Sequence, residues 1–139
     1  MLYFAYGSNL NKYRFEERIG EHKIISKYLL KDYDLVFNTG QSIAYASIIK
    51  KKGAFVEGVV YEINSFQEHI LDQYEGIKLR TYTKEYIDYL GEPMLVYIGK
   101  LLTHSNPSLW YLLIILQGCI DFELTKTKEK IENLIETLY

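Results

Sequence analysis

The chain has 139 residues, a length typical of one domain and long enough to bury about two thirds of its unfolded surface. Hydrophobic residues make up 48% and charged residues 24%, as in folded globular proteins, which excludes a disordered chain. The net charge is −2, and the basic cluster at residues 50–52 is interpreted as a solvated loop. We therefore expect a single domain over residues 1–139 that does not bind nucleic acid.

Cysteine and histidine usage argues against disulfides and metal sites. Cys119 is the single cysteine, and the three histidines are scattered without the spacing of metal ligands. The chain begins directly with an apolar segment that lacks the features of a signal peptide, and its longest apolar run, residues 109–116, is too short to span a membrane. We expect a cytoplasmic protein that uses no cofactor and has no membrane partner. The oligomeric state stays open, with a homodimer among the alternatives.

The N-terminal segments predict a strand, a tight turn and a short helix. Residues 2–6 are apolar and aromatic, and the following Gly7-Ser8-Asn9 consists of residue types that tolerate the backbone angles of turns. Residues 12–19 carry loosely spaced apolar side chains and are followed by Gly20, a pattern typical of a short helix and its end.

The middle of the chain has the pattern of a β-sheet. Six runs have strand character, namely residues 23–30, 33–38, 44–50, 55–63, 81–89 and 94–100. Glycine-containing turns separate several of them. Because residues 56–63 are almost continuously apolar, we expect them to form a strand in the middle of the sheet, buried on both faces.

A helix is predicted from Ser65 to Glu75. Ser65 and Glu68 have the spacing of a capping box, in which two side chains bond the free N–H groups of the first turn. Apolar residues then recur at helical spacing, and Gly76 supplies a C-terminal glycine. Glu75 is therefore expected at the point where the helix enters a loop.

Two further helices are expected near the C-terminus. Asn106-Pro107 has the pattern of an N-cap followed by proline, which predicts an apolar helix from there to Gly118. Apolar residues at helical spacing predict an amphipathic packing helix from about residue 126. The periodicity of the chain by itself indicates an α+β fold.

Two segments carry residues suited to catalysis, although each also has an ordinary structural explanation. Successive N–H groups in the turn of Tyr6, Gly7, Ser8 and Asn9 can converge on a carboxylate or an oxyanion, but such turns occur in most proteins. Glu75 is framed by Tyr74 and followed by Tyr82, so it can be partly desolvated and act as a base. The alternative for Glu75 is a solvated charge at a helix end.

Several ordered segments together resemble the γ-glutamyl cyclotransferase family over most of the chain. The matching segments are Tyr3-Phe4-Ala5-Tyr6-Gly7-Ser8-Asn9-Leu10, residues 32–37, 46–48 and 56–61, and the catalytic-like stretch at residues 71–76. The resemblance implies that Glu75 is the general acid and base. It also implies substrate binding by the strand and loop residues Tyr3, Tyr6, Gly7, Ser8, Asn9 and Leu10 and by the pocket residue Tyr82.

A downstream stretch extends the resemblance toward the substrate. Residues 107–111 are similar to a segment of relatives that act on γ-glutamyl amino acids, which implies another pocket tyrosine at Tyr111. We expect Tyr82 and Tyr111 to form walls of the pocket and to offer their hydroxyls. Arg80 departs from the family, which often has a glycine there, and either contacts the leaving group or points to solvent. The resemblance implies a small, curved, largely antiparallel sheet or barrel flanked by helices, within the mixed α/β class.

The resemblance also implies the reaction. The α-amine of a γ-glutamyl amino acid or peptide attacks its own γ-carbonyl and releases 5-oxoproline and a free amine. Such a reaction requires neither an enzyme nucleophile nor a metal, in keeping with the motifs of this sequence. The alternatives are a γ-glutamylamine cyclotransferase, an enzyme that removes a γ-glutamyl protecting group, a non-catalytic binding module of the same fold, and a general hydrolase.

Overall fold

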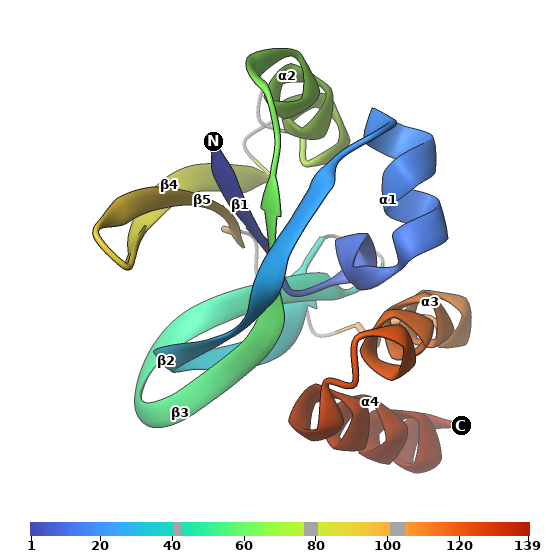
Figure 1. Ribbon diagram of the computed structural model, residues 1–139. Helices are drawn as coiled ribbons and strands as arrows, with labels where there is room; N and C mark the ends of the chain where they lie inside the picture. The colour runs from blue at the N-terminus through green and yellow to red at the C-terminus, as the bar shows by residue number, and fades with distance from the viewer. Residues whose placement is uncertain (41–42, 77–80, 101–104) are drawn as a thin grey trace.

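The computed structural model describes residues 1–40, 43–76, 81–100 and 105–139, and Figure 1 shows a curved sheet with helices packed beside it. In chain order the elements are β1 (Leu2–Ala5), η1 (Ser8–Leu10), α1 (Lys12–Ile19), β2 (Lys23–Thr39), β3 (Tyr45–Glu62), α2 (Ser65–Tyr74), β4 (Tyr82–Tyr89), β5 (Glu92–Gly99), α3 (Leu109–Asp121) and α4 (Thr125–Leu138). The predicted mixed α/β class with a largely antiparallel sheet is confirmed, and the sheet is open rather than a closed barrel.

The five strands lie in the order β2-β3-β1-β5-β4. All neighbouring strands are antiparallel except β1 and β5, which are parallel and place Tyr3 opposite Leu95. Side chains of the central strand β1 alternate between the two faces of the sheet. Tyr3 and Ala5 therefore pack on one face, and Phe4 and Tyr6 pack on the other.

β2 and β3 are two long paired strands, where the sequence predicts four shorter ones. Their register shifts at Asp32: Lys31 pairs with Phe55, whereas Tyr33 pairs with Lys50. Asp32 has a left-handed φ of 64°, so the predicted breaks are bulges that bend the hairpin without ending it. The basic residues 50–52 are exposed but belong to β3 rather than to a loop. Residues 56–63 lie almost entirely in β3, between β2 and β1, and are thus internal although not central.

The capping box of α2 lies one residue before the predicted one. The Asn64 side chain accepts a hydrogen bond from the Gln67 N–H at 2.8 Å, and the Gln67 side chain accepts from the Asn64 N–H at 3.0 Å. The sequence therefore holds two overlapping boxes, since Ser65 and Glu68 have the same spacing. Gln67 is buried and also donates to the Ile19 carbonyl at 3.0 Å, a tertiary contact that favours the observed register.

The predicted start of α3 is wrong. The helix begins at Leu109 with Ser108 as its N-cap, and the Ser108 hydroxyl accepts a hydrogen bond from the Tyr111 N–H at 3.2 Å. Asn106-Pro107 precedes the cap and is not part of the helix. Serine, like asparagine, is a favoured N-cap, so composition did not distinguish the two positions.

The predicted end of α3 is also wrong, because Gly118 lies inside a helix that continues to Asp121. A Cβ atom at position 118 would lie 2.4 Å from the backbone of Leu10. Glycine is required there because α3 packs directly against the backbone of the turn after β1. The residue that was interpreted as a helix end is a contact between two elements.

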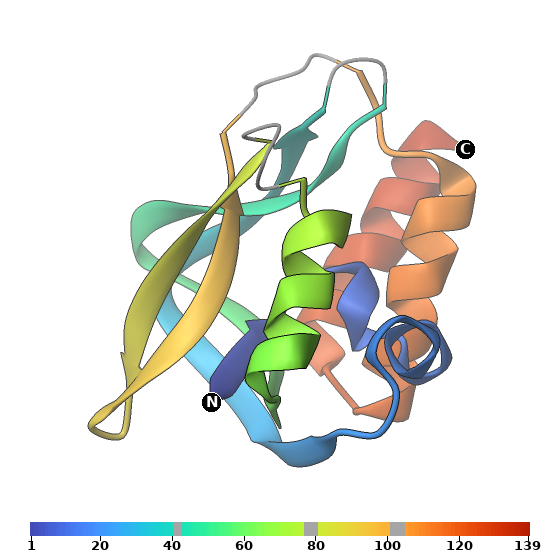
Figure 2. The same cartoon turned by 90° about the horizontal axis from the view of Figure 1, so that it is seen from above.

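Two hydrophobic layers cover the two faces of the sheet. The layer under the helices includes Phe15 of α1, Leu71 of α2, Cys119 of α3 and Ile131 of α4, all fully buried. Burial raises the pKa of the Cys119 thiol to about 12. The second layer lies on the other face, where residues of the β2–β3 and β4–β5 hairpins enclose it. Figure 2 shows the helices gathered on one side of the strands.

Polar contacts attach α4 to the sheet. The Thr127 N–H donates to the Glu57 carboxylate at 2.8 Å, and Lys130 Nζ lies 3.0 Å from an Asp34 oxygen. α4 has no N-cap side chain of its own, so Glu57 of β3 supplies an acceptor to its first turn. Within the residues that the structure describes, no helix is both long and apolar enough to cross a membrane.

Candidate functional site

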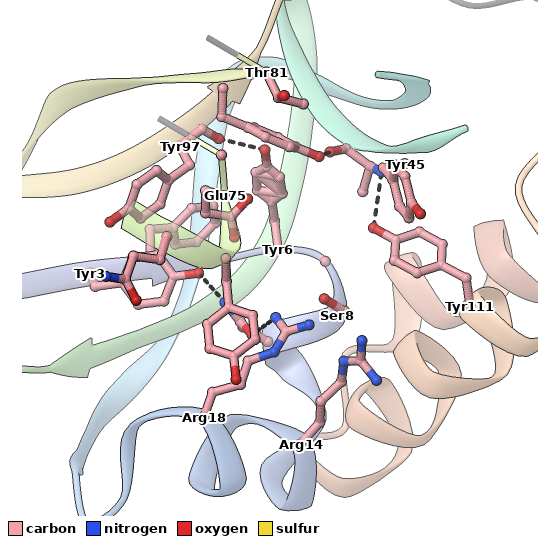
Figure 3. A pocket seen from close by; sticks show the side chains of 18 residues that line it. Tyr3, Tyr6, Ser8, Arg14, Arg18, Tyr45, Glu75, Thr81, Tyr97 and Tyr111 are labelled. Atoms are coloured by element: carbon pink, nitrogen blue, oxygen red, sulfur yellow. Dashed lines mark hydrogen bonds between the residues drawn. The ribbon is translucent and has the colours of Figure 1, made fainter. Parts of the chain in front are cut away.

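A cavity of about 430 Å³ opens between β1, the turn that follows it, α1 and the C-terminal end of α2 (Figure 3). Its volume is typical of small-molecule sites. The cavity is lined by eight of the residues that the sequence assigned to the site, namely Tyr3, Tyr6, Gly7, Ser8, Asn9, Glu75, Tyr82 and Tyr111. Leu10 is fully buried beneath the turn, against Gly118, and does not line the cavity. Arg80 lies outside the described residues.

Asn9 fixes the turn after β1 through its side chain and its backbone. Its Nδ2 donates to the Tyr3 hydroxyl at 2.9 Å, and its Oδ1 accepts from Arg18 Nη1 at 2.7 Å. Its carbonyl accepts from the Tyr61 hydroxyl at 3.1 Å. Asn9 is only 3% exposed, and its side chain is engaged by protein partners. We therefore assign Asn9 to holding the shape of the turn.

The turn keeps some backbone donors available. The N–H groups of Leu10 and Asn11 bond to the carbonyls of Gly7 and Ser8 at 3.0 and 3.1 Å. In the part of the chain that the structure describes, no hydrogen bond occupies the N–H groups of Gly7, Ser8 or Asn9. All three residues line the cavity, so their donors are suited to a carboxylate or an oxyanion.

Glu75 supplies the acidic group of the cavity. It caps the C-terminal end of α2, its N–H bonds to the Leu71 carbonyl at 2.8 Å, and its residue is half-buried. Burial raises the pKa of its carboxyl group to about 7, and the positive charge of the Arg18 guanidinium offsets a smaller part of this rise. Figure 3 shows the carboxyl group beside Tyr6. A carboxyl group with a pKa near neutrality can both accept and donate a proton at physiological pH.

The tyrosine side chains that line the cavity are anchored by the protein. The Tyr6 hydroxyl donates to the Tyr97 carbonyl at 2.5 Å, and the Tyr82 hydroxyl donates to the Ala46 carbonyl at 2.6 Å. The protons of these two hydroxyls are therefore used within the protein, whereas the sequence led us to expect that Tyr82 offers its hydroxyl to a ligand. The Tyr111 hydroxyl accepts from the Ala46 N–H at 3.0 Å, so its own O–H remains able to donate.

Burial keeps these tyrosines protonated. It raises the pKa of Tyr6, Tyr82 and Tyr111 well above the ordinary value of 10.0, and the nearby Glu75 charge raises each pKa further. The hydroxyls consequently act as neutral groups at physiological pH. Within the described residues, no cluster of three or more His, Cys, Asp or Glu side chains forms a potential metal site.

Sequence reasoning missed several residues that line the cavity, including two arginines. Arg14 and Arg18 lie four residues apart on α1 and therefore on one face of the helix. The Arg18 guanidinium lies over the Tyr74 ring at 4.6 Å. The Tyr45 ring contacts the Tyr111 ring edge-on at 5.2 Å. The spacing of the arginines directly after the turn was the one available signal, and it is also common on solvated helices.

Comparison with known proteins places this chain in a family. The model of a family described as gamma-glutamyl cyclotransferase, AIG2-like, matches residues 3–109. Human gamma-glutamylcyclotransferase is 34% identical over 88 residues, which cover 58% of this chain and 47% of the human protein. The chain therefore spans about half the length of this curated relative.

Solved structures share the fold. A gamma-glutamyl cyclotransferase structure matches with a TM-score of 0.84 at 28% identity, over 95% of this chain and 86% of that one. A yeast gamma-glutamyl cyclotransferase described as specific to glutathione matches with a TM-score of 0.59 at 12% identity, over 96% of each chain, which shows the fold alone. Because the family model covers most of the sequence, the chain belongs to the gamma-glutamyl cyclotransferase, AIG2-like family.

Proposed function

We propose that this chain is a γ-glutamyl cyclotransferase that converts a γ-glutamyl amino acid or peptide into 5-oxoproline and a free amine. The observation that carries the proposal is the half-buried Glu75, whose pKa burial raises to about 7, in a cavity shared with unoccupied backbone donors of the turn at residues 7–9. Family membership and fold support γ-glutamyl cyclotransferase activity in general.

In the proposed mechanism the substrate supplies its own nucleophile. The Glu75 carboxylate accepts a proton from the α-ammonium group, and the free amine attacks the γ-carbonyl carbon to close a five-membered ring. The N–H groups of Gly7 and Ser8 stabilise the oxyanion that forms. The Glu75 carboxylic acid then gives its proton to the departing nitrogen as the amide bond breaks, and the Glu75 carboxylate accepts the second proton, which the ring nitrogen must lose to become an amide. That proton passes to the released amine, which leaves as an ammonium group. Neither water nor a covalent enzyme intermediate takes part.

The cavity favours the reaction mainly by orientation and proton transfer. Holding amine and carbonyl at attack distance can contribute several kcal/mol or more, and general acid–base catalysis contributes about 10²–10⁴ in rate. The ring walls of Tyr6 and Tyr82 restrict the folded substrate, and their fixed hydroxyls keep these rings in place.

The identity of the product tests the reaction class. Purified protein is incubated with γ-glutamyl-alanine in ¹⁸O-labelled water, and the products are identified by mass spectrometry. Cyclotransfer yields 5-oxoproline without solvent oxygen and intact alanine, and a substrate acetylated on its α-nitrogen gives no product. Labelled glutamate would instead indicate a hydrolase, and binding without any product would indicate a binding module.

Glu75→Gln tests the proposed catalytic group. An amide cannot shuttle the proton, so kcat should fall by at least about 10²-fold, while the variant still folds and binds γ-glutamyl ligands. Circular dichroism and calorimetric titration with γ-glutamyl-alanine check folding and binding. Turnover close to that of the parent protein would remove Glu75 from the mechanism.

A further inference from the structure

Two positive charges face the cavity, and in the described part of the chain neither forms an ion pair within 4.0 Å with an acidic side chain. Figure 3 shows the side chains of Arg14 and Arg18 extending from α1 toward the cavity, and both residues line it. Among the residues described by the structure, the ion pairs within 4.0 Å are made by lysines. Burial lowers the pKa of Arg18, and the nearby charge of Arg14 lowers it further, so the two guanidinium groups repel each other. A bound anion would relieve this repulsion.

The two arginines are not equivalent. Arg18 already has protein partners, because its Nη1 donates to the Asn9 side chain at 2.7 Å and its guanidinium group lies over the Tyr74 ring. Its charge also acts on Glu75. The Nε of Arg14, in contrast, is buried and has no hydrogen-bond partner in the described part of the structure. A buried donor without a partner costs free energy, and a ligand oxygen that reached this atom would recover that cost.

The charged groups that line the cavity are complementary to those of one substrate class. The described lining residues carry two guanidinium groups, on Arg14 and Arg18, and one carboxyl group, on Glu75. A γ-glutamyl amino acid has the complementary set, with one ammonium group and two carboxylates. A γ-glutamyl derivative of a simple alkylamine lacks the carboxylate on the leaving side and leaves one guanidinium group without a partner.

We propose, on the basis of the function proposed above, that Arg14 binds the carboxylate of the amino acid that is released. The Nε and one terminal nitrogen of a guanidinium group form a planar pair of donors that matches the two oxygens of a carboxylate. Arg18, which lies close enough to Glu75 to influence its charge, remains for the γ-glutamyl side of the substrate. Arg14 thereby makes the enzyme selective for γ-glutamyl amino acids over γ-glutamylamines.

A matched pair of substrates tests this assignment. γ-Glutamylethylamide is γ-glutamyl-alanine with a hydrogen in place of the alanine carboxylate, and 5-oxoproline formation gives kcat/KM for both. The parent protein should prefer γ-glutamyl-alanine by about 10–100-fold, the range expected for a charge-assisted pair. Arg14→Gln should lose this preference because its KM for γ-glutamyl-alanine rises. Its kcat/KM for the ethylamide should stay within about twofold of the parent value.

Two further variants separate recognition from general charge effects. Arg14→Lys keeps the charge without the planar fork and should retain part of the preference. Lys12→Gln removes a positive charge from the same helix at an exposed position outside the cavity lining and should leave the preference unchanged. Thermal unfolding by circular dichroism confirms that each variant folds.

Several outcomes would overturn the assignment. One is a loss of kcat/KM in Arg14→Gln that is equal for the two substrates, and another is a loss of the preference in Lys12→Gln as large as that in Arg14→Gln. The third is a parent protein that shows no preference for γ-glutamyl-alanine, a result that needs no variant to fold. If 5-oxoproline forms in any of these cases, the proposed function stands and only the role of Arg14 fails. The absence of 5-oxoproline from every γ-glutamyl compound would overturn the proposed function itself.

Discussion

Glu75 couples the stability of the fold to pH. Burial raises its pKa from an ordinary value of 4.5 to about 7, so the folded chain holds this proton more tightly than the unfolded chain. The resulting stabilisation is fully present below the unfolded pKa of 4.5 and is lost as the pH rises through about 7. The protonated form that stabilises the fold is unable to act as a base, which places stability and the proposed catalysis in opposition.

Urea unfolding of the parent protein and Glu75→Gln over the pH range measures this coupling. Between about pH 4.5 and 8 the parent should lose up to about 3 kcal/mol relative to the variant, less the part screened by solvent in the cavity. The variant should therefore be the more stable protein at the alkaline end. Parallel pH profiles for the two proteins would show that Glu75 is ordinarily solvated.

At the residue scale, local patterns and the family resemblance together singled out Glu75 and the turn at residues 7–9, and the structure places these residues around one cavity. The two arginines could not be found, because their spacing is the same on a solvated helix and only the tertiary fold turns that face inward. The fixed hydroxyl of Tyr82 depends on the Ala46 carbonyl, 36 residues away in the chain.

Among the elements, α3 determines the position of the turn after β1. In Gly118→Ala a Cβ atom would lie 2.4 Å from the Leu10 backbone, so helix and turn must separate. Although alanine favours helices, we expect a loss of about 1–3 kcal/mol in the free energy of unfolding, and a lower kcat/KM because the turn moves. Chemical denaturation and 5-oxoproline assays measure the two effects.

Gln117→Ala is the matched control for this substitution. Gln117 is exposed on the same helix, and its side chain bonds to Asp121 at the helix surface, so its replacement should change stability by no more than about 0.5 kcal/mol. If Gly118→Ala behaves like this control, the contact between α3 and the turn does not constrain the site.

Element boundaries were predicted less well than element types, for physical reasons that the structure identifies. At α2 two capping boxes overlap, and the buried Gln67 selects the earlier one through its bond to Ile19. At β2 the bulge around Asp32 has the composition of a turn, yet pairing resumes beyond it. In both cases contacts between distant segments decide between local patterns of similar strength.

At the scale of the whole molecule, the cavity is completed by a region beyond the family match. The match ends at residue 109, whereas Tyr111 and Gly118 both lie on α3. α3 is in turn packed with α4, which Glu57 ties to β3 through Thr127. The resemblance of residues 107–111 to the family indicated Tyr111 as a pocket residue. The contact between Gly118 and Leu10 could be seen only in the folded structure.

Cys119 can be used to measure how often α3 separates from the rest of the protein. The thiol is fully buried beside Gly118 and is the single cysteine of the chain, so one thiol-specific reagent reports on one place. With its pKa raised to about 12, the thiol should react only when α3 leaves the rest of the protein. A chromogenic disulfide should therefore modify the native protein slowly and the urea-unfolded protein at once.

The effect of a bound ligand on the rate of Cys119 labelling then shows whether opening of α3 is coupled to the cavity. If opening of α3 dismantles the wall at Tyr111, γ-glutamyl-alanine bound to the Glu75→Gln variant should slow the labelling by a factor of one plus the ligand concentration over Kd. Rapid labelling of the native protein, or labelling that a saturating ligand does not slow, would show that the helix opens independently of the cavity. The rate of a single thiol reaction thus measures how often the C-terminal helices expose the site.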